Sequence, residues 1–198
     1  MVDVRIPFSQ PRATLVGFDQ FSLDELMLLA DSESSSGYTT CTPVVAGDDG
    51  IRRATAEWIT RGQVIDRSGV AFQPVTAFPE PGLLEWSADG TTMIERAPSA
   101  EYFELWQLVP GTGYALEHRR IDERTEWYRT GDVAVVVRDR SVSIPRLARL
   151  QGLIADCGGD RSAIAALLNC EFSVGHFGEL GWTVISSTLP WRVGEALL

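Results

Sequence analysis

The stretch that decides the fold reads L-L-E-W-S-A-D-G-T-T-M-I-E-R-A over residues 83–97. Two short runs rich in apolar and aromatic residues flank a turn at Asp89 and Gly90, which is typical of paired strands. Similar short runs, separated by further turns, continue as far as Arg138. We therefore predict an antiparallel meander with strands over residues 83–88, 91–97, 101–109, 114–121, 125–129 and 132–138.

The residues after the meander predict a helical hairpin. Ser143 and Pro145 are typical of a helix start, and the glycine pair at 158–159 would end that helix. Asp160 then caps a second helix over 160–168. We expect both helices to lie on the sheet, followed by one more strand over 182–188.

The residues before the meander predict a helix and then a loop. Ser22, with Glu25 three positions later, forms a capping box that opens this helix. The helix is expected to end near Asp31. The serine-rich residues 32–43 are expected to form a flexible connection.

A second helix and a small hairpin are expected next. Apolar residues recur at helical spacing from Ile51 to Ile59, and Gly62 would end that helix. Residues 63–65 and 70–72 then flank a turn. A helix followed by a small hairpin is the order found in a winged-helix element.

Together these elements predict an α+β fold. An N-terminal helix-hairpin element of winged-helix type leads into an antiparallel sheet of about six strands, and a helical hairpin packs on that sheet near the C-terminus. We expect a single domain over residues 1–198. A subdivision would place a helix-rich part at 1–80 and the sheet with its helical hairpin at 81–198.

Composition describes a soluble globular protein: 198 residues, of which 44% are hydrophobic and 22% charged. The longest apolar stretch is far shorter than the roughly 20 residues that a membrane-spanning helix needs. The N-terminal residues also lack the apolar run of a secretory signal peptide. We expect a cytoplasmic protein with no membrane contact.

The basic residues exclude several kinds of chemistry. All seventeen are arginine, so the chain has no Schiff-base lysine, no phosphate-loop lysine and no kinase lysine. The formal net charge is −10. Because a negative field repels nucleic acid, we expect no nucleic-acid binding. The acidic surface would serve solubility or complement a basic partner.

No catalytic, cofactor-binding or metal-binding motif is present, so we expect no cofactor and no enzymatic activity. Cys41, Cys157 and Cys170 form no Cys-x-x-Cys pair and are expected to be reduced thiols. The two histidines, His118 and His176, do not have the spacing of a zinc site. If the protein were an enzyme of an unrecognised type, His118 and the nearby carboxylates would be its site. These carboxylates are Asp122, Glu123 and Glu126.

Residues 54–69 carry a family resemblance and read A-T-A-E-W-I-T-R-G-Q-V-I-D-R-S-G. This segment resembles an element of the ESX (type VII) secretion-associated chaperones, the EspG-like family of actinobacteria. In that element a helix, an Arg-Gly stop, an acidic residue and a glycine turn follow one another. The resemblance covers residues 21–72. It implies a cytosolic chaperone that binds a helical secretion substrate and keeps it soluble until export, which requires no catalytic residue.

We therefore predict a non-enzymatic cytosolic protein that binds another protein, with the chaperone role as its most specific form. The alternative is a winged-helix transcriptional regulator, in which arginines of the same segment would contact phosphates: Arg52, Arg53, Arg61 and Arg67.

Tryptophans that remain exposed would mark the partner-binding surface. The candidates are chosen from their positions on predicted strands or, near Pro190, in a tail that we expect to be loose. They are Trp86, Trp106, Trp127 and Trp191.

Overall fold

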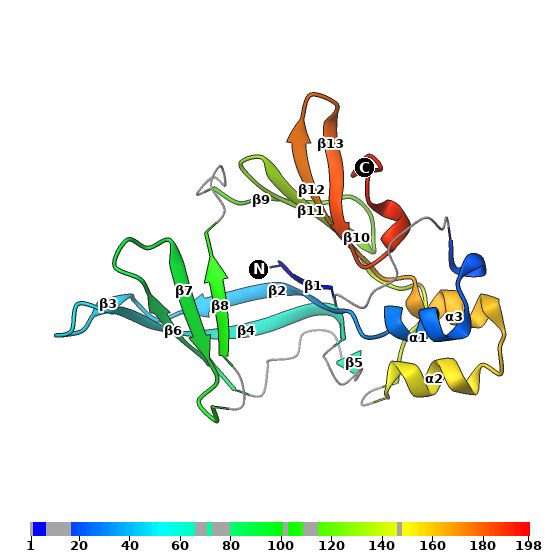
Figure 1. The fold of residues 1–198 in the computed structure, drawn as a ribbon, viewed down its shortest axis with the longest axis horizontal. Coiled ribbons are helices and arrows are strands. Elements are labelled where there is room, and N and C mark those ends of the chain that lie inside the picture. The colour runs from blue at the N-terminus through cyan, green and yellow to red at the C-terminus, as the bar shows by residue number, and fades with distance from the viewer. Residues whose placement is uncertain are drawn as a thin grey trace. The chain divides into compact units, whose positions relative to one another are not determined.

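A computed structural model describes residues 2–6, 17–65, 71–72, 80–100, 103–108, 115–145 and 148–198. These residues form an α+β fold of mostly antiparallel strands in two sheets, with three α-helices (Figure 1). The predicted fold class is thus confirmed in its coarse form. None of the helices in the described ranges has the length and the apolar character that crossing a membrane requires.

The chain divides into two compact units. The first consists of Gly37–Arg61 and Val75–Pro110 together with Met1, and the second of Val2–Ser36, Gly62–Pro74 and Gly111–Leu198. These bounds differ from a subdivision at residue 80. The expectation of a single domain over 1–198 stays a prediction.

The first sheet has the strand order β1-β2-β4-β6-β7-β8, and β3 and β5 also pair with β4. Every strand pairing for which a register is given is antiparallel. The strands are β1 (Val2–Arg5), β2 (Glu33–Cys41), β3 (Val45–Ala46), β4 (Arg52–Ile65), β5 (Ala71–Phe72), β6 (Gly82–Trp86), β7 (Thr92–Arg96) and β8 (Phe103–Gln107).

The second sheet lies within the second unit and has the order β13-β12-β11-β10-β9. Its strands are β9 (Glu117–Arg120), β10 (Thr125–Thr130), β11 (Val133–Arg138), β12 (Glu171–Gly178) and β13 (Gly181–Ser187). Both faces of this sheet carry buried apolar side chains. Trp127 and Val136 belong to one cluster, and Tyr128 and Phe172 belong to the other.

Three short α-helices form a separate core in the second unit. They are α1 (Leu23–Leu29), α2 (Leu150–Asp156) and α3 (Arg161–Leu168), and single 3-10 turns lie at Phe18–Gln20 (η1) and Pro190–Arg192 (η2). Their fully buried members include Phe21, Leu26, Leu150, Ile154 and Ile164. Figure 1 shows the three helices grouped together. Two consecutive helices, α2 and α3, thus follow the meander strands, but the predicted hairpin packed on the sheet is not confirmed, because their described core is shared with α1.

The predicted caps of α1 and α3 are confirmed, whereas the helix start predicted at Ser143 and Pro145 is wrong, because α2 begins at Leu150 and its N-cap residue, Arg149, makes no side-chain capping bond. Glu25 donates its backbone N–H to Ser22 Oγ at 3.3 Å, and Ser22 returns its N–H to Glu25 Oε2 at 2.7 Å. These contacts lower the pKa of Glu25, because hydrogen bonds from Ser22 favour the charged carboxylate. Asp160 accepts N–H groups of Ser162 and Ala163 at the start of α3.

Replacing Ser22 with Ala is expected to lower the free energy of unfolding by about 1 kcal/mol, because an N–H group at the start of α1 loses its acceptor. Urea unfolding of Ser22→Ala measures the loss. Ser22→Asp retains a capping oxygen and should keep most of the stability. Equal losses in both variants would contradict a capping role.

The winged-helix element is a wrong prediction, since residues 52–65 form strand β4 and not a helix. The burial of β4 has the period of a strand: Ala54 and Ala56 are buried, whereas Glu57 and Ile59 are exposed. Gly62 lies inside the strand and ends no helix. The small hairpin is confirmed by the pairing of β4 with β5, although residues 66–70 at its turn lie outside the described residues.

Three further expectations need correction. Residues 33–41 are strand β2 and not a flexible connection, and the serines at 34–36 are buried. All six meander strands exist, but three belong to each sheet rather than to one sheet. The tail after Pro190 is packed and not loose, because Leu197 is only 1% exposed.

Candidate protein-binding surface

Strands β6, β7 and β8 place a group of apolar side chains on one face of the first sheet. Leu83 aligns with Arg96, which aligns with Phe103. In the next row Glu85 aligns with Ile94, and Ile94 with Leu105. Because directly opposed residues in a sheet point to the same side, these side chains share one face. We define the outer face as Leu83, Ile94, Phe103 and Leu105.

The outer face is open to solvent. Phe103 is 68% exposed, Leu105 is 69% exposed and Leu83 is 42% exposed. Ile94 is half-buried between its neighbours. Scattered exposed apolar side chains are common on soluble proteins, but adjacent ones on a single face mark binding sites.

The opposite face of the same strands carries the buried residues of the first unit. Within the described ranges, its buried apolar side chains are three alanines and one leucine: Ala54, Ala56, Ala97 and Leu84. A sheet must cover an apolar face with another layer in order to bury it. The described part of the first unit therefore buries part of the inner face, whereas Leu83, Phe103 and Leu105 on the outer face are exposed.

Charged side chains border the outer face. Arg53 donates Nε to Glu85 Oε1 at 2.9 Å and Nη2 to Asp49 Oδ2 at 2.7 Å. On the next row, the guanidinium carbon of Arg96 lies 5.8 Å from the centre of the Phe103 ring. Arg96 lies between Leu83 and Phe103 in one row, and Glu85 lies beside Ile94 in the other, so charged and apolar side chains are mixed on this face.

The hydrogen bond from Arg53 lowers the pKa of Asp49 to about 2, with help from the N–H of Ile51. Asp49 and Glu85 together raise the pKa of Arg53. Because the pKa of Asp49 is depressed in the folded chain, its contribution to stability is present above the ordinary value of 3.8. This contribution disappears as the pH falls toward 2.

Replacing Arg53 with Gln is expected to raise the pKa of Asp49 toward its ordinary value, because the largest cause of the depression is removed. Titration of the Asp49 carboxyl carbon by NMR measures both midpoints. Arg52→Gln is the matched control, since Arg52 donates instead to the backbone carbonyl of Ser87. A midpoint near 3.8 in the unmodified chain would contradict the ion pair.

A shallow depression of about 310 Å³ borders the same surface. Ile94 and Leu105 contribute its apolar lining, and Asp49 and Glu85 contribute carboxylates. Its lining residues all belong to the first unit. The outer face is therefore a hollowed, mixed surface and not a uniformly flat one.

The structure separates the four candidate tryptophans. Trp86 and Trp106 lie in one row on the inner face, each aligned with Met93 between them, and Trp106 is 39% exposed. Trp127 is 6% exposed and packs in the second sheet against Trp182. Trp191 packs edge-on against Phe18 at 4.7 Å in the helical core. Trp127 and Trp191 therefore serve as packing residues.

The four outer-face residues were missed by the sequence interpretation. In the β8 sequence F-E-L-W-Q, apolar residues occupy both alternating sets of positions, so the pattern does not tell the covered face from the exposed one. The alternating positions of Phe103 and Leu105 indicate an exposed apolar face only if the opposite face of β8 is already known to be covered.

His118 does have an ionisable neighbour. Its Nε2 lies 3.4 Å from Glu126 Oε2, its ring stacks on Tyr128 at 4.6 Å, and the Tyr128 hydroxyl donates to the same carboxylate. However, neither the depression beside the outer face nor the interior cavity of the second unit is lined by His118 or His176. Within the described ranges, no three His, Cys, Asp or Glu side chains gather as a metal site would require.

The acidic loop beside His118 has a structural use. Asp122 Oδ1 accepts the N–H groups of Arg124 and Thr125, both at 2.8 Å, and the first of these bonds is the main cause of its lowered pKa. Arg120 donates to the carbonyls of Asp122 and Glu123. These contacts hold the turn between β9 and β10.

The arginines of the regulator alternative are not gathered into a phosphate-binding patch by the described residues. Arg53 is occupied by two carboxylates, and Arg52 donates to a backbone carbonyl. The side chain of Arg61, and Arg67 as a whole, lie outside the described residues.

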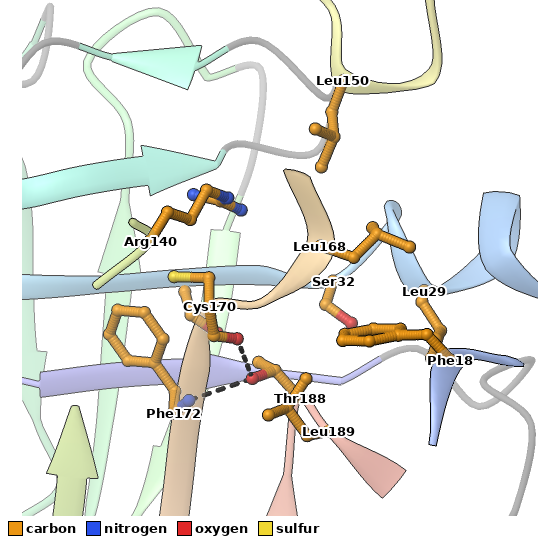
Figure 2. Close-up of a pocket in the computed structure, with 11 residues that line it drawn as sticks. Phe18, Leu29, Ser32, Arg140, Leu150, Leu168, Cys170, Phe172, Thr188 and Leu189 are labelled. Carbon is orange, nitrogen blue, oxygen red and sulfur yellow. Dashed lines mark hydrogen bonds between the residues drawn. The ribbon is translucent and has the colours of Figure 1, made fainter. Parts of the chain in front are cut away.

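An interior cavity in the second unit is too small for a metabolite. It measures about 20 Å³, which is room for a single water molecule. Figure 2 shows its lining, in which the Thr188 hydroxyl accepts the N–H of Phe172 and donates to the carbonyl of Cys170. The cavity is a packing feature of the second unit and not a candidate site.

The three cysteines are expected to react at very different rates with a thiol reagent. Cys41 is exposed, whereas burial raises the pKa of the Cys170 thiol and disfavours the reactive thiolate. Mass spectrometry after timed alkylation should show Cys41 modified first and Cys170 modified only on unfolding. Rapid labelling of Cys170 in the folded chain would contradict its buried position.

In comparisons with known proteins, the chain matched no family model, no curated protein and no solved structure.

Proposed function

We propose that this chain binds another protein through the outer face of β6, β7 and β8. The observation that carries this proposal is the pair Phe103 and Leu105, which are more than two-thirds exposed and lie in neighbouring rows of one face. Holding two large apolar side chains in water has a free-energy cost that a partner removes by covering them.

The surroundings of this pair support binding of a protein rather than of a small molecule. The depression beside this face is open rather than enclosed, whereas sites for metabolites surround most of their ligand. The face also supplies both signs of charge through Arg53, Glu85 and Arg96. Charged groups beside apolar side chains give specificity to an interface whose affinity comes from its apolar contacts.

The chaperone function in the cytoplasm, with a helical secretion substrate, is the specific form of this proposal that the resemblance implies. The helix that the resemblance expects over residues 54–61 is strand β4. The proposed binding surface does not depend on that helix, because it is built from β6, β7 and β8.

The double substitution Phe103→Ser with Leu105→Ser tests the proposal. Both side chains are exposed, so the stability of the chain should change little, whereas loss of two apolar anchors should weaken partner binding at least roughly tenfold. Proteins captured from the native host by the tagged full chain are quantified for the unmodified chain and for each variant.

Leu180→Ser is the matched control, because Leu180 is 95% exposed in the turn between β12 and β13. A partner captured by the unmodified chain and by Leu180→Ser, but lost from the double variant, supports the proposal. A captured set that is the same for all three chains would overturn it.

A further inference from the structure

We propose that residues 193–198, which we call the strap, occupy a binding site for an extended, leucine-bearing segment of another protein. The site opens when the strap leaves it. It lies within the second unit and contains no residue of the outer face. Its parts are the edge of β13, a socket for the leucine side chain and an arginine that holds the backbone of the segment.

The strap pairs with the edge of β13 as an antiparallel strand does (Figure 1). Val184 donates its N–H to the carbonyl of Glu195 and accepts the N–H of Gly194, both at 2.9 Å. Leu197 donates its N–H to the carbonyl of Trp182 at 3.1 Å, and an antiparallel bridge lies between these bonds. Because the bonds use only the backbone of the strap, another extended segment can make the same bonds.

One side chain anchors the strap. Within residues 193–198 only Leu197 is buried, and the other five residues are exposed. Burial of apolar surface is the main contribution that holds a segment in place. A segment with a single apolar anchor can therefore open locally while the rest of its unit stays folded. The strap is thus packed and also detachable.

The Leu197 side chain lies in a socket of the second sheet. It shares one buried cluster with Trp127, Ala134, Val136 and Val184. The floor of the socket is Gly175 of β12, because a Cβ atom added there would lie 2.7 Å from Leu197 Cδ2. A glycine at this position provides the space that the leucine fills, so the socket selects an apolar side chain of this size.

Arg192 holds the backbone of the segment. It donates Nη2 to the carbonyls of Ala196 and Leu197, at 3.0 and 3.1 Å, and Nε to the buried Glu171 at 2.8 Å. Arg192 precedes the strap, and Trp191 beside it packs against the helical core. The guanidinium therefore stays with the site when the strap opens, and it can donate to the carbonyls of another segment.

A segment of another protein suits this site better than the strap of a second copy does. Leu197 lies six residues after Trp191, which is fixed in the helical core, so it reaches at most about 20 Å from that anchor. Exchange of straps would therefore bring two chains close together, each with a net charge of −10. Such like charges repel each other, whereas a leucine-bearing segment of a different protein meets neither restriction.

Hydrogen exchange of the unmodified chain tests whether the strap opens. The N–H groups of Val184 and Leu197 join the strap to β13, whereas the N–H of Phe172 bonds to the Thr188 hydroxyl. We expect Val184 and Leu197 to share one protection factor, at least about a hundredfold lower than that of Phe172. Exchange of all three only through global unfolding would overturn the proposal.

Peptide binding tests the site itself. The probe is a synthetic peptide with the sequence of residues 193–198, V-G-E-A-L-L, and its affinity for the full chain is measured by NMR titration. Leu197→Ala removes the anchor of the chain's own strap, and Leu198→Ala is the matched control because Leu198 is exposed. We expect Leu197→Ala to bind the peptide at least about tenfold more tightly than Leu198→Ala, since its site is open in a larger fraction of the molecules.

Two glycine substitutions assign this binding to the socket. Gly175→Ala added to Leu197→Ala should abolish the gain, because the new methyl group occupies the socket. Gly178→Ala is the control in the same strand and should keep the gain, since a Cβ atom there meets nothing within 4 Å.

Three results would overturn the proposal, and none of them concerns the outer face. They are equal affinities of Leu197→Ala and Leu198→Ala, equal effects of alanine at 175 and 178, and a dimer of the unmodified chain that Leu197→Ala converts to a monomer in light scattering. The dimer would make the strap of a second copy the occupant. If Leu197→Ala does not fold, hydrogen exchange of the unmodified chain still decides whether the strap opens.

Discussion

Replacing Glu171 with Ala is expected to lower the free energy of unfolding by about 3 to 5 kcal/mol. The Glu171 side chain is fully buried at the start of β12. Its carboxylate lies 3.1 Å from Arg138 Nη1 and 2.8 Å from Arg192 Nε, and it also accepts the Ser173 hydroxyl. Removing the carboxylate leaves the buried Ser173 hydroxyl and the largely buried Arg192 guanidinium without their acceptor, whereas Arg138 is 44% exposed and keeps water contact.

The same substitution should loosen the C-terminal segment. Arg192 donates Nη2 to the carbonyls of Ala196 and Leu197, at 3.0 and 3.1 Å, while Glu171 holds its Nε. Urea unfolding measures the loss of stability, and amide exchange at Leu197 measures the loosening. Glu179→Ala, in the exposed turn after β12, is the control and should change stability by less than about 0.5 kcal/mol. A loss below about 1 kcal/mol for Glu171→Ala would contradict its structural role.

Replacing Phe21 with Ala is expected to cost about 3 to 5 kcal/mol, because it opens a cavity in the helical core. Phe21 is 1% exposed and its ring centre lies 5.9 Å from that of Trp191. Its carbonyl also accepts a hydrogen bond from Arg161 of α3. The affected core thus connects α1 and α3 with the C-terminal segment.

Thermal or urea unfolding measures this cost. The control is Leu23→Ala, two residues along, whose side chain is 46% exposed. Its expected effect is small, since little packing is removed. Similar losses for Phe21→Ala and Leu23→Ala would show that the helical core is not packed as described. Neither Glu171 nor Phe21 belongs to the outer face, so both variants also report on stability separately from binding.

The elements that the sequence predicted correctly are those with local chemical signals. The capping box at Ser22 and Glu25, the cap at Asp160 and the glycines at 158–159 depend on contacts within a few residues. Gly158 and Gly159 have φ angles of +58° and +87°, which glycine adopts readily. The short strands of the meander were also found because turns punctuate them.

The prediction of a helix over residues 51–62 is wrong because the small and apolar residues of this segment fit both the spacing of a helix and the alternation of a strand. Ala54 and Trp58 fit helical spacing from Ile51, but Ala54 and Ala56 also alternate as a strand requires. In the structure this segment is a strand that pairs with β6, where Arg53 lies opposite Glu85, a residue 32 positions away along the chain. Such a long-range contact leaves no local signal.

The proposed binding surface lies at other residues than the tryptophans that the sequence suggested. Tryptophans were expected to mark it, yet Trp127 and Trp191 contribute more by filling cores in the second unit. The exposed positions are instead Phe103 and Leu105, which a sequence does not distinguish from core residues. Which face of a sheet remains uncovered depends on the amount of core available elsewhere in the unit.

The most direct measurement is site-specific photo-crosslinking in the native host, with a photoreactive amino acid placed at Leu105 in one chain and at Leu180 in another. Binding through the outer face predicts a discrete adduct with a second protein at Leu105 and none at Leu180. No adduct at Leu105, or the same adducts at both positions, would contradict binding through the outer face.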